Sequence, residues 1–120
     1  MKILIADDEP NIVTALEFLL TRGGYEVAVA RDGAEALALV ESLAPDLMLL
    51  DVMMPVRSGY DVCREIRSRP DGGRIRIVML SAKGGTAEVS KGLEAGADLY
   101  VTKPFSNREL MDKIRALLRG

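Results

Sequence analysis

Short apolar runs alternate with helical patterns along the whole chain. The runs that favour strands, each bounded by Gly, Pro or Asp, are residues 3–6, 25–30, 47–50, 75–80 and 99–101. Between them, apolar residues recur three or four positions apart, as in Ile12, Leu16 and Leu19 or in Leu110, Ile114 and Leu117. The pattern therefore predicts five strands and five helices in alternation, which is an α/β fold.

The third run is apolar at every position. Residues 47–50 read Leu, Met, Leu and Leu, so a strand formed there has no polar face. This is typical of a central parallel strand that helices cover on both sides. We therefore expect a three-layer α/β sandwich around a parallel sheet.

Polar residues indicate where helices begin and end. Asp32 lies where it can cap the second helix. Ser106 precedes the last helix and Glu109 follows three residues later, which is the spacing of a capping box. The polar stretch 67–74, between the third helix and the fourth strand, is predicted to be a solvated loop.

Length, charge and hydropathy restrict the class of protein. A chain of 120 residues, 48% of them hydrophobic, can build one core, so residues 1–120 are expected to form a single domain. The net charge of −2, with Lys and Arg scattered, does not favour direct binding of nucleic acid. No apolar run reaches membrane-spanning length, and we expect a cytoplasmic protein without membrane contact.

Two residue types restrict the chemistry. Histidine is absent, which excludes a histidine base and a histidine metal ligand. The single cysteine, Cys63, cannot form an internal disulfide and is expected to be a small core residue. Chemistry in this chain therefore depends on carboxylates, hydroxyls and lysine.

Polar side chains follow four of the predicted strands directly. The first strand runs into Asp7, Asp8 and Glu9, the third into Asp51, the fourth into Ser81 and the fifth into Thr102 and Lys103. In an open parallel sheet, ligands bind beyond the carboxyl ends of the strands. We therefore expect these residues to surround one shallow site.

Convergence of Asp7, Asp8 and Asp51 would be unfavourable without a counter-ion. Two like charges roughly 5 Å apart repel by roughly 3 kcal/mol at an effective dielectric constant of ~20. Oxygen ligands without sulfur or imidazole suit Mg²⁺. Asp7 and Asp8 could also be only a solvated helix start, but Asp51 independently ends an apolar strand, where an unpaired carboxylate is unusual.

Lys103 follows the fifth strand and precedes Pro104, whose ring restricts the lysine backbone and can accompany a cis peptide bond. An ammonium at this position can bridge the carboxylates and then a phosphoryl oxygen. The hydroxyl of Ser81 can bond a phosphoryl oxygen as well, although each residue alone is also compatible with an ordinary surface or turn position.

Four segments around these strand ends carry a family pattern. They are residues 5–10 (IADDEP), 45–55 (PDLMLLDVMMP) followed by Gly59, 81–82 (SA) and 96–105 (GADLYVTKPF). With these segments in this order and at these spacings, the chain resembles the receiver domains of two-component response regulators along essentially its whole length. The resemblance implies a flavodoxin-like sheet with strand order 2-1-3-4-5.

The resemblance also implies a role for each site residue. Asp51 is the expected phosphoacceptor, and Lys103 is expected to neutralise the acyl phosphate. The expected Mg²⁺ ligands are Asp7, Asp8, Asp51 and the main-chain carbonyl of Met53. Ser81 and Tyr100 occupy the switch positions, so Ser81 is expected to move toward the phosphoryl group and Tyr100 to swing inward.

The expected function is a phosphorylation-dependent signalling switch. Its phosphodonor would be a phosphohistidine of a sensor histidine kinase or phosphotransfer protein. Its output would be a changed surface of the fourth helix, fifth strand and fifth helix, recognised by an output domain or target protein. We expect no enzymatic activity beyond its own phosphoryl transfer and autodephosphorylation.

The same surface leads us to expect only a weak or conditional homodimer. Receivers attached to DNA-binding domains commonly dimerise there through charge pairs, and Asp98, Glu109 and Lys113 could contribute to such pairs. Val89 and Leu99, however, occupy positions where charged residues are usual in that subgroup.

Two other classes of function fit the sequence less well. An aspartate-nucleophile phosphatase of the haloacid dehalogenase type needs two aspartates two positions apart after the first strand, whereas Asp7 and Asp8 are adjacent. A receiver-like adaptor without phosphorylation is disfavoured by the presence of Asp8, Asp51, Ser81 and Lys103 together.

Overall fold

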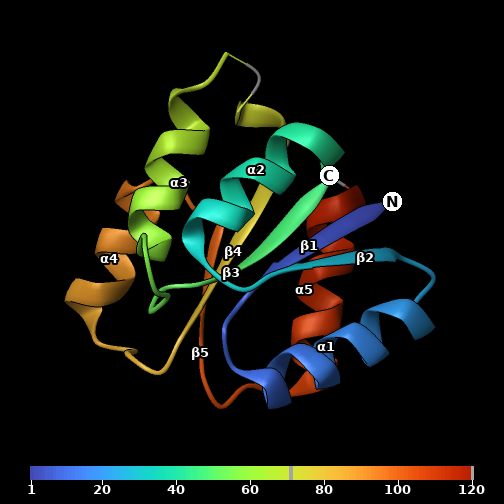
Figure 1. Ribbon diagram of the computed structural model, residues 1–120. Helices are drawn as coiled ribbons and strands as arrows, with labels where there is room; N and C mark the ends of the chain where they lie inside the picture. Colours follow the sequence, from blue (N-terminus) through green and yellow to red (C-terminus); the bar gives the residue numbers. More distant parts are fainter. Residues whose placement is uncertain (71, 120) are drawn as a thin grey trace.

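The computed structural model describes residues 1–70 and 72–119. Within them, strands and helices alternate (Figure 1). The elements are β1 (Lys2–Ala6), α1 (Pro10–Arg22), β2 (Glu26–Ala30), α2 (Gly33–Leu43), β3 (Leu47–Asp51), α3 (Gly59–Ser68), the 3-10 helix η1 (Gly72–Arg74), β4 (Arg76–Ser81), α4 (Thr86–Glu94), β5 (Leu99–Thr102) and α5 (Asn107–Arg119). Each predicted strand is confirmed, and its ends differ from the prediction by at most one residue.

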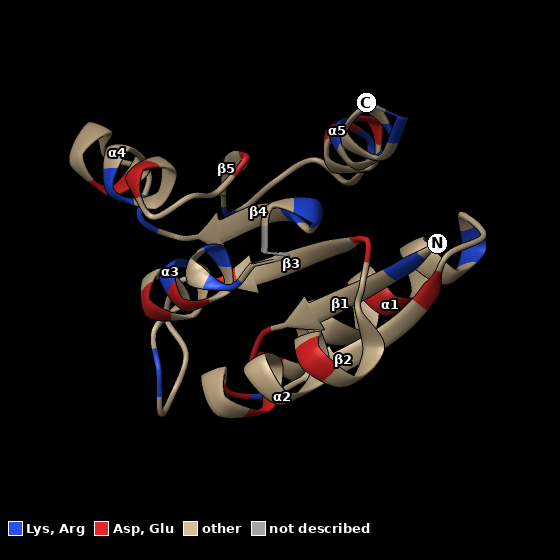
Figure 2. Ribbon diagram, turned by 90° about the horizontal axis from the view of Figure 1, so that it is seen from above, with Lys and Arg blue, Asp and Glu red and all other residues tan. Residues whose placement is uncertain are grey.

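The strands form one parallel sheet in the order β2-β1-β3-β4-β5. Helices α1 and α5 lie on one side of this sheet, and α2, α3 and α4 lie on the other (Figure 2). The predicted three-layer sandwich with flavodoxin-like strand order is therefore confirmed. None of the described helices is long and apolar enough to cross a lipid bilayer.

Two cores, one on each face of the sheet, hold the layers together. One contains Leu16 of α1 and Ile114 of α5, and the other contains Val40 of α2 and Ile66 of α3. Every residue of β3 is buried, as its uniformly apolar sequence predicted. The central strand is therefore fixed on both faces, and the position of its last residue, Asp51, is fixed with it.

Both predicted helix caps are present. The Oδ1 atom of Asp32 accepts a hydrogen bond from the main-chain N–H of Glu35 at 2.8 Å. The Oγ atom of Ser106 accepts one from the main-chain N–H of Glu109 at 3.3 Å. Each bond satisfies an N–H group that has no partner within its own helix.

The prediction of a loop over residues 67–74 is wrong for most of the stretch, although the residues whose burial is described there are exposed or half-buried, as a solvated segment requires. Helix α3 continues to Ser68, and η1 covers Gly72–Arg74; Asp71 lies outside the described residues. The helix stops before Arg69, whose extended backbone (φ −80°, ψ 151°) is the conformation favoured before Pro70.

The contacts of Arg67 stabilise the last turn of α3. Its guanidinium donates hydrogen bonds to the carbonyl oxygens of Ile75 (2.7 Å) and Gly96 (2.9 Å) and to the carboxylate of Asp98 (2.9 Å). The Asp98 carboxylate also accepts from the main-chain N–H of Ile77 at 2.8 Å. Arg67 therefore joins the end of α3 to the start of β4 and to the α4–β5 connection.

Candidate functional site

The three aspartates come together at the carboxyl ends of neighbouring strands. Asp7 follows β1 directly, Asp8 is the next residue, and Asp51 is the last residue of β3, which pairs with β1. Asp7 and Asp51 are buried and Asp8 is exposed. One carboxylate oxygen from each lies within 4.8 Å of the others. The oxygen-only donor set, open on the side of Asp8, suits a hard cation such as Mg²⁺.

Gly59 shapes the backbone around Asp51. A Cβ atom at this position would lie 2.5 Å from the Asp51 carbonyl oxygen and 2.8 Å from the Cα atom of Val52. The Gly59 N–H donates a hydrogen bond to the Val52 carbonyl at 2.9 Å. Only glycine fits this approach, so the start of α3 is packed directly against the end of β3.

Lys103 lies among the carboxylates. Its Nζ atom is 3.0 Å from Glu9 Oε1, 3.2 Å from Asp7 Oδ2 and 3.6 Å from Asp51 Oδ1. The main-chain N–H of Lys103 donates to the Ser81 carbonyl at 2.7 Å, and the Lys103–Pro104 peptide bond is cis. The structure therefore brings Lys103 to the aspartates, and it adds Glu9 as the partner nearest to the ammonium.

The surroundings change the acidity of two site residues. Burial raises the pKa of Asp51 to about 6, and the charges of Asp7 and Asp8 act in the same direction, while Lys103 and the Met53 N–H offset part of the rise. Burial by itself would lower the pKa of Lys103, but the hydrogen bond to Glu9 and the charges of Asp51 and Asp7 outweigh it and the pKa is raised. At neutral pH, Asp51 is thus mostly ionised and Lys103 is charged.

Met53 follows Asp51 by two residues and contacts it through the main chain. Its N–H donates to Asp51 Oδ1 at 3.3 Å, and its side chain is exposed. This contact orients the carboxylate; the Met53 carbonyl as a metal ligand stays a prediction.

Ser81 and Tyr100 are connected through one residue, Lys83. The Ser81 hydroxyl accepts a hydrogen bond from the Lys83 N–H at 3.0 Å, and the Tyr100 hydroxyl donates one to the Lys83 carbonyl at 2.7 Å. The Tyr100 ring packs against Gly92, where a Cβ atom would lie 2.7 Å from the ring. Tyr100 is therefore half-buried against α4 in this structure, and its movement on phosphorylation stays a prediction.

Several contacts in and near the site were missed by the sequence analysis. Tyr60, buried at the start of α3, donates a hydrogen bond to the Glu88 carboxylate of α4 at 3.0 Å. The Lys91 ammonium lies 4.5 Å from the centre of the Tyr60 ring. These residues join α3 to α4 beside Tyr100. Because they are far apart in the sequence, no local sequence pattern predicts that they are in contact.

The structure also shows the environments of Cys63 and of the charged residues considered for dimerisation. Cys63 is buried, and burial raises the pKa of its thiol to about 11, which agrees with a small core residue. The Oδ2 atom of Asp98 accepts hydrogen bonds within the molecule, from Arg67 and from the Ile77 N–H, while the residue itself is exposed; its part in an intermolecular charge pair stays a prediction. Glu109 and Lys113 lie exposed on α5.

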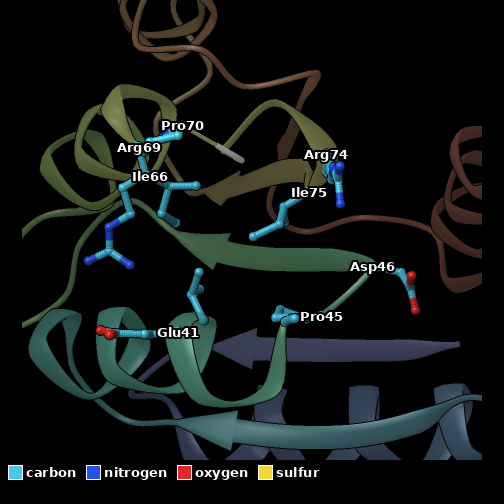
Figure 3. A pocket seen from close by; sticks show the side chains of 10 residues that line it. Glu41, Pro45, Asp46, Ile66, Arg69, Pro70, Arg74 and Ile75 are labelled. Carbon is cyan, nitrogen blue, oxygen red and sulfur yellow. The ribbon is translucent and has the colours of Figure 1, made fainter.

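A hollow also lies away from the acidic site. It has a volume of about 600 Å³ and lies at the opposite ends of the strands, between α2, the end of α3 and the starts of β3 and β4 (Figure 3). Val40, Ile66 and Ile75 line it together with Arg69 and Arg74. It contains none of the strand-end carboxylates, so it is not part of the acidic site.

Comparison with known proteins identifies the family. A family model described as "Response regulator receiver domain" matches residues 3–115. The chain therefore belongs to the receiver domains of response regulators, the signalling proteins of two-component systems.

Two curated relatives support the assignment. The DNA-binding response regulator MtrA of Mycolicibacterium smegmatis is 48% identical over 118 residues, which cover 98% of this chain and 50% of the relative. The probable transcriptional regulator ycf27 of Cyanophora paradoxa is 52% identical over 118 residues, which cover 98% and 48% respectively. The chain thus spans about half the length of these relatives.

A solved structure is similar over the whole chain. The receiver domain of the sensor histidine kinase PA1611 from Pseudomonas aeruginosa is 33% identical, with a TM-score of 0.91 over 99% of this chain and 98% of that one. That protein has a magnesium ion coordinated in its active site cleft.

Proposed function

We propose that this receiver domain is a switch controlled by phosphorylation of Asp51. The observation that carries the proposal is the placement of a buried carboxylate within 4.8 Å of two others and 3.6 Å from a lysine ammonium, at the end of a fixed central strand. The phosphodonor is a phosphohistidine of a sensor histidine kinase or phosphotransfer protein.

Asp51 is suited to act as the nucleophile. Its Oδ atom attacks phosphorus in line with the phosphorus–nitrogen bond of the donor, and the electron pair of that bond stays on the imidazole nitrogen. The Met53 N–H orients the carboxylate, and the Lys103 ammonium balances negative charge that develops on the transferred group. Its raised pKa leaves Asp51 ionised at neutral pH, as a nucleophile must be.

Asp7, Asp8, Asp51 and the Met53 carbonyl are the residues proposed to hold Mg²⁺. When bound, Mg²⁺ neutralises charge on the phosphoryl oxygens and lowers the repulsion between donor and carboxylates. Without it, the Lys103 ammonium lies near Glu9, Asp7 and Asp51, and Asp8 adds a further carboxylate to the group. In this proposal, no activity beyond the domain's own phosphorylation and dephosphorylation is needed.

The output is proposed to pass through the surface of α4, β5 and α5. Ser81 contacts the N–H of Lys83 and Tyr100 contacts its carbonyl, so a movement of Ser81 toward a phosphoryl oxygen pulls on the main chain that holds Tyr100. An output domain or target protein would recognise the change. Homodimerisation through this surface is expected to be weak, and a cytoplasmic location stays a prediction.

Intact-mass measurement after incubation with acetyl phosphate and Mg²⁺ tests the proposal. We expect one added phosphoryl group on the wild type, none on Asp51→Asn, and an unchanged level on the control Asp112→Asn, whose carboxylate lies exposed on α5. A chelator should abolish the addition. A wild-type protein that stays unmodified would favour the adaptor alternative, and addition to Asp51→Asn would refute the site.

A further inference from the structure

Glu9 lies at the edge of the acidic site without a role in the function proposed above. It occupies the N-cap position of α1, yet its side chain makes no capping hydrogen bond. Its carboxylate instead reaches Lys103, 94 residues away in the sequence. A side chain 56% exposed is therefore committed to an ion pair across the mouth of the site rather than to its own helix.

The distances rank the partners of Lys103. Its ammonium donates hydrogen bonds to Glu9 at 3.0 Å and to Asp7 at 3.2 Å, whereas Asp51 at 3.6 Å is beyond hydrogen-bond distance. The Lys103 side chain is only 10% exposed, so water screens these contacts less than it would on an open surface. In this arrangement the ammonium is held between Asp7 and Glu9, short of Asp51.

A phosphoryl group on Asp51 brings new anionic oxygens to the same ammonium. Asp7 is a proposed Mg²⁺ ligand, so its charge is balanced when Mg²⁺ is bound. Glu9 is outside the proposed ligand set, so it remains ion-paired with Lys103. A further negative charge also repels the incoming group. Glu9 therefore acts against the contact that stabilises the phosphorylated form.

We propose that Glu9 is a positioning residue that holds Lys103 away from Asp51 and thereby weakens the hold of the site on a phosphoryl group. The inference rests on the proposed function, because it concerns the phosphorylated state of Asp51. The Glu9 carboxylate then competes with the phosphoryl group for the Lys103 ammonium.

Binding of beryllofluoride, a phosphoryl mimic, at saturating Mg²⁺ tests the proposal by titration calorimetry. Mg²⁺ binding is titrated separately for each variant, so that an effect on the metal is not mistaken for one on the mimic. We expect Glu9→Gln to bind beryllofluoride about threefold tighter than the wild type, as expected for an ion pair with one exposed partner. The control Glu17→Gln, which removes an exposed charge elsewhere on α1, should bind like the wild type.

Glu9→Asp separates the ion pair from the charge alone. It keeps the negative charge, but its side chain is one methylene shorter and does not reach Lys103 in the same geometry. We expect it to bind beryllofluoride more tightly than the wild type. If Glu9→Asp matches the wild type while Glu9→Gln binds more tightly, the charge acts generally and not through Lys103, and the proposal is overturned.

The titration distinguishes failure of the proposed function from failure of the role of Glu9. If the wild type binds no beryllofluoride in the presence of Mg²⁺, the proposed function fails, and this inference fails with it. If the wild type binds and Glu9→Gln binds equally or more weakly, only the role of Glu9 is refuted. Thermal unfolding of each variant shows that it is folded during the titration.

Discussion

Replacing Asp51 with asparagine should stabilise the metal-free protein at neutral pH. Asp51 is 3% exposed and lies beside Asp7 and Asp8, and its pKa is raised from 3.8 to about 6. Each tenfold change in acidity corresponds to about 1.4 kcal/mol, so this rise corresponds to roughly 3 kcal/mol. Asparagine has nearly the same shape without the charge, and we expect Asp51→Asn to gain about 2 to 3 kcal/mol in the free energy of unfolding.

The gain should depend on pH in a defined direction. Below pH 3.8, Asp51 is protonated in both the folded and the unfolded protein, so ionisation has no effect on stability. As pH rises toward about 6, the unfolded chain loses this proton first, and the wild type loses stability relative to the variant. Above about 6 the difference is complete and stays constant.

Urea unfolding in the presence of a chelator, at a series of pH values from about 4 to 8, measures this difference. The control Asp112→Asn, an exposed carboxylate paired with Arg115, should change stability by less than about 1 kcal/mol at every pH. Added Mg²⁺ should reduce the advantage of Asp51→Asn, because it stabilises only the ionised site. A gain that is equal at pH 4 and pH 8, or a loss at neutral pH, would refute the reasoning.

Three further predictions concern single substitutions. Val56 has a φ of +72°, a strained value for a β-branched residue, so Val56→Gly should raise the free energy of unfolding in urea by about 1 kcal/mol; a decrease would contradict the strain. Tyr60→Phe removes the hydroxyl bound to Glu88 and should lower the same free energy by about 1 kcal/mol, whereas no change would show that this bond is not stabilising. Asp8→Ala should diminish the rise in melting temperature that Mg²⁺ causes in the wild type, and an undiminished rise would exclude Asp8 as a ligand.

Much of the fold and the grouping of the site could be predicted because both follow from local sequence. Runs of apolar residues bounded by Gly, Pro or Asp define strands. The burial of β3 follows from its almost entirely apolar sequence. Once the sheet is parallel, the residues after each strand must meet at one edge. This rule alone brings Asp7, Asp51 and Lys103 together, as the structure shows.

The contacts that could not be predicted join residues far apart in the sequence and depend on how helices pack. Arg67 looked like part of a polar loop, but its partners Gly96 and Asp98 are 29 and 31 residues away. Glu9 resembled a continuation of the acidic run, and its ion pair depends on where the end of β5 places Lys103. Charged side chains carry no signal that separates solvation from such pairing, because the same residue types serve both.

Chemical identification of the phosphorylated residue tests the central claim most directly. An acyl phosphate on aspartate is reduced by borohydride to homoserine, and peptide mass spectrometry then locates the converted residue. After treatment with acetyl phosphate and Mg²⁺, we expect homoserine at position 51 and unchanged aspartate at positions 7 and 8. Conversion at Asp7 or Asp8, or no conversion in a folded protein that binds Mg²⁺, would contradict the assignment of Asp51 as the phosphoacceptor.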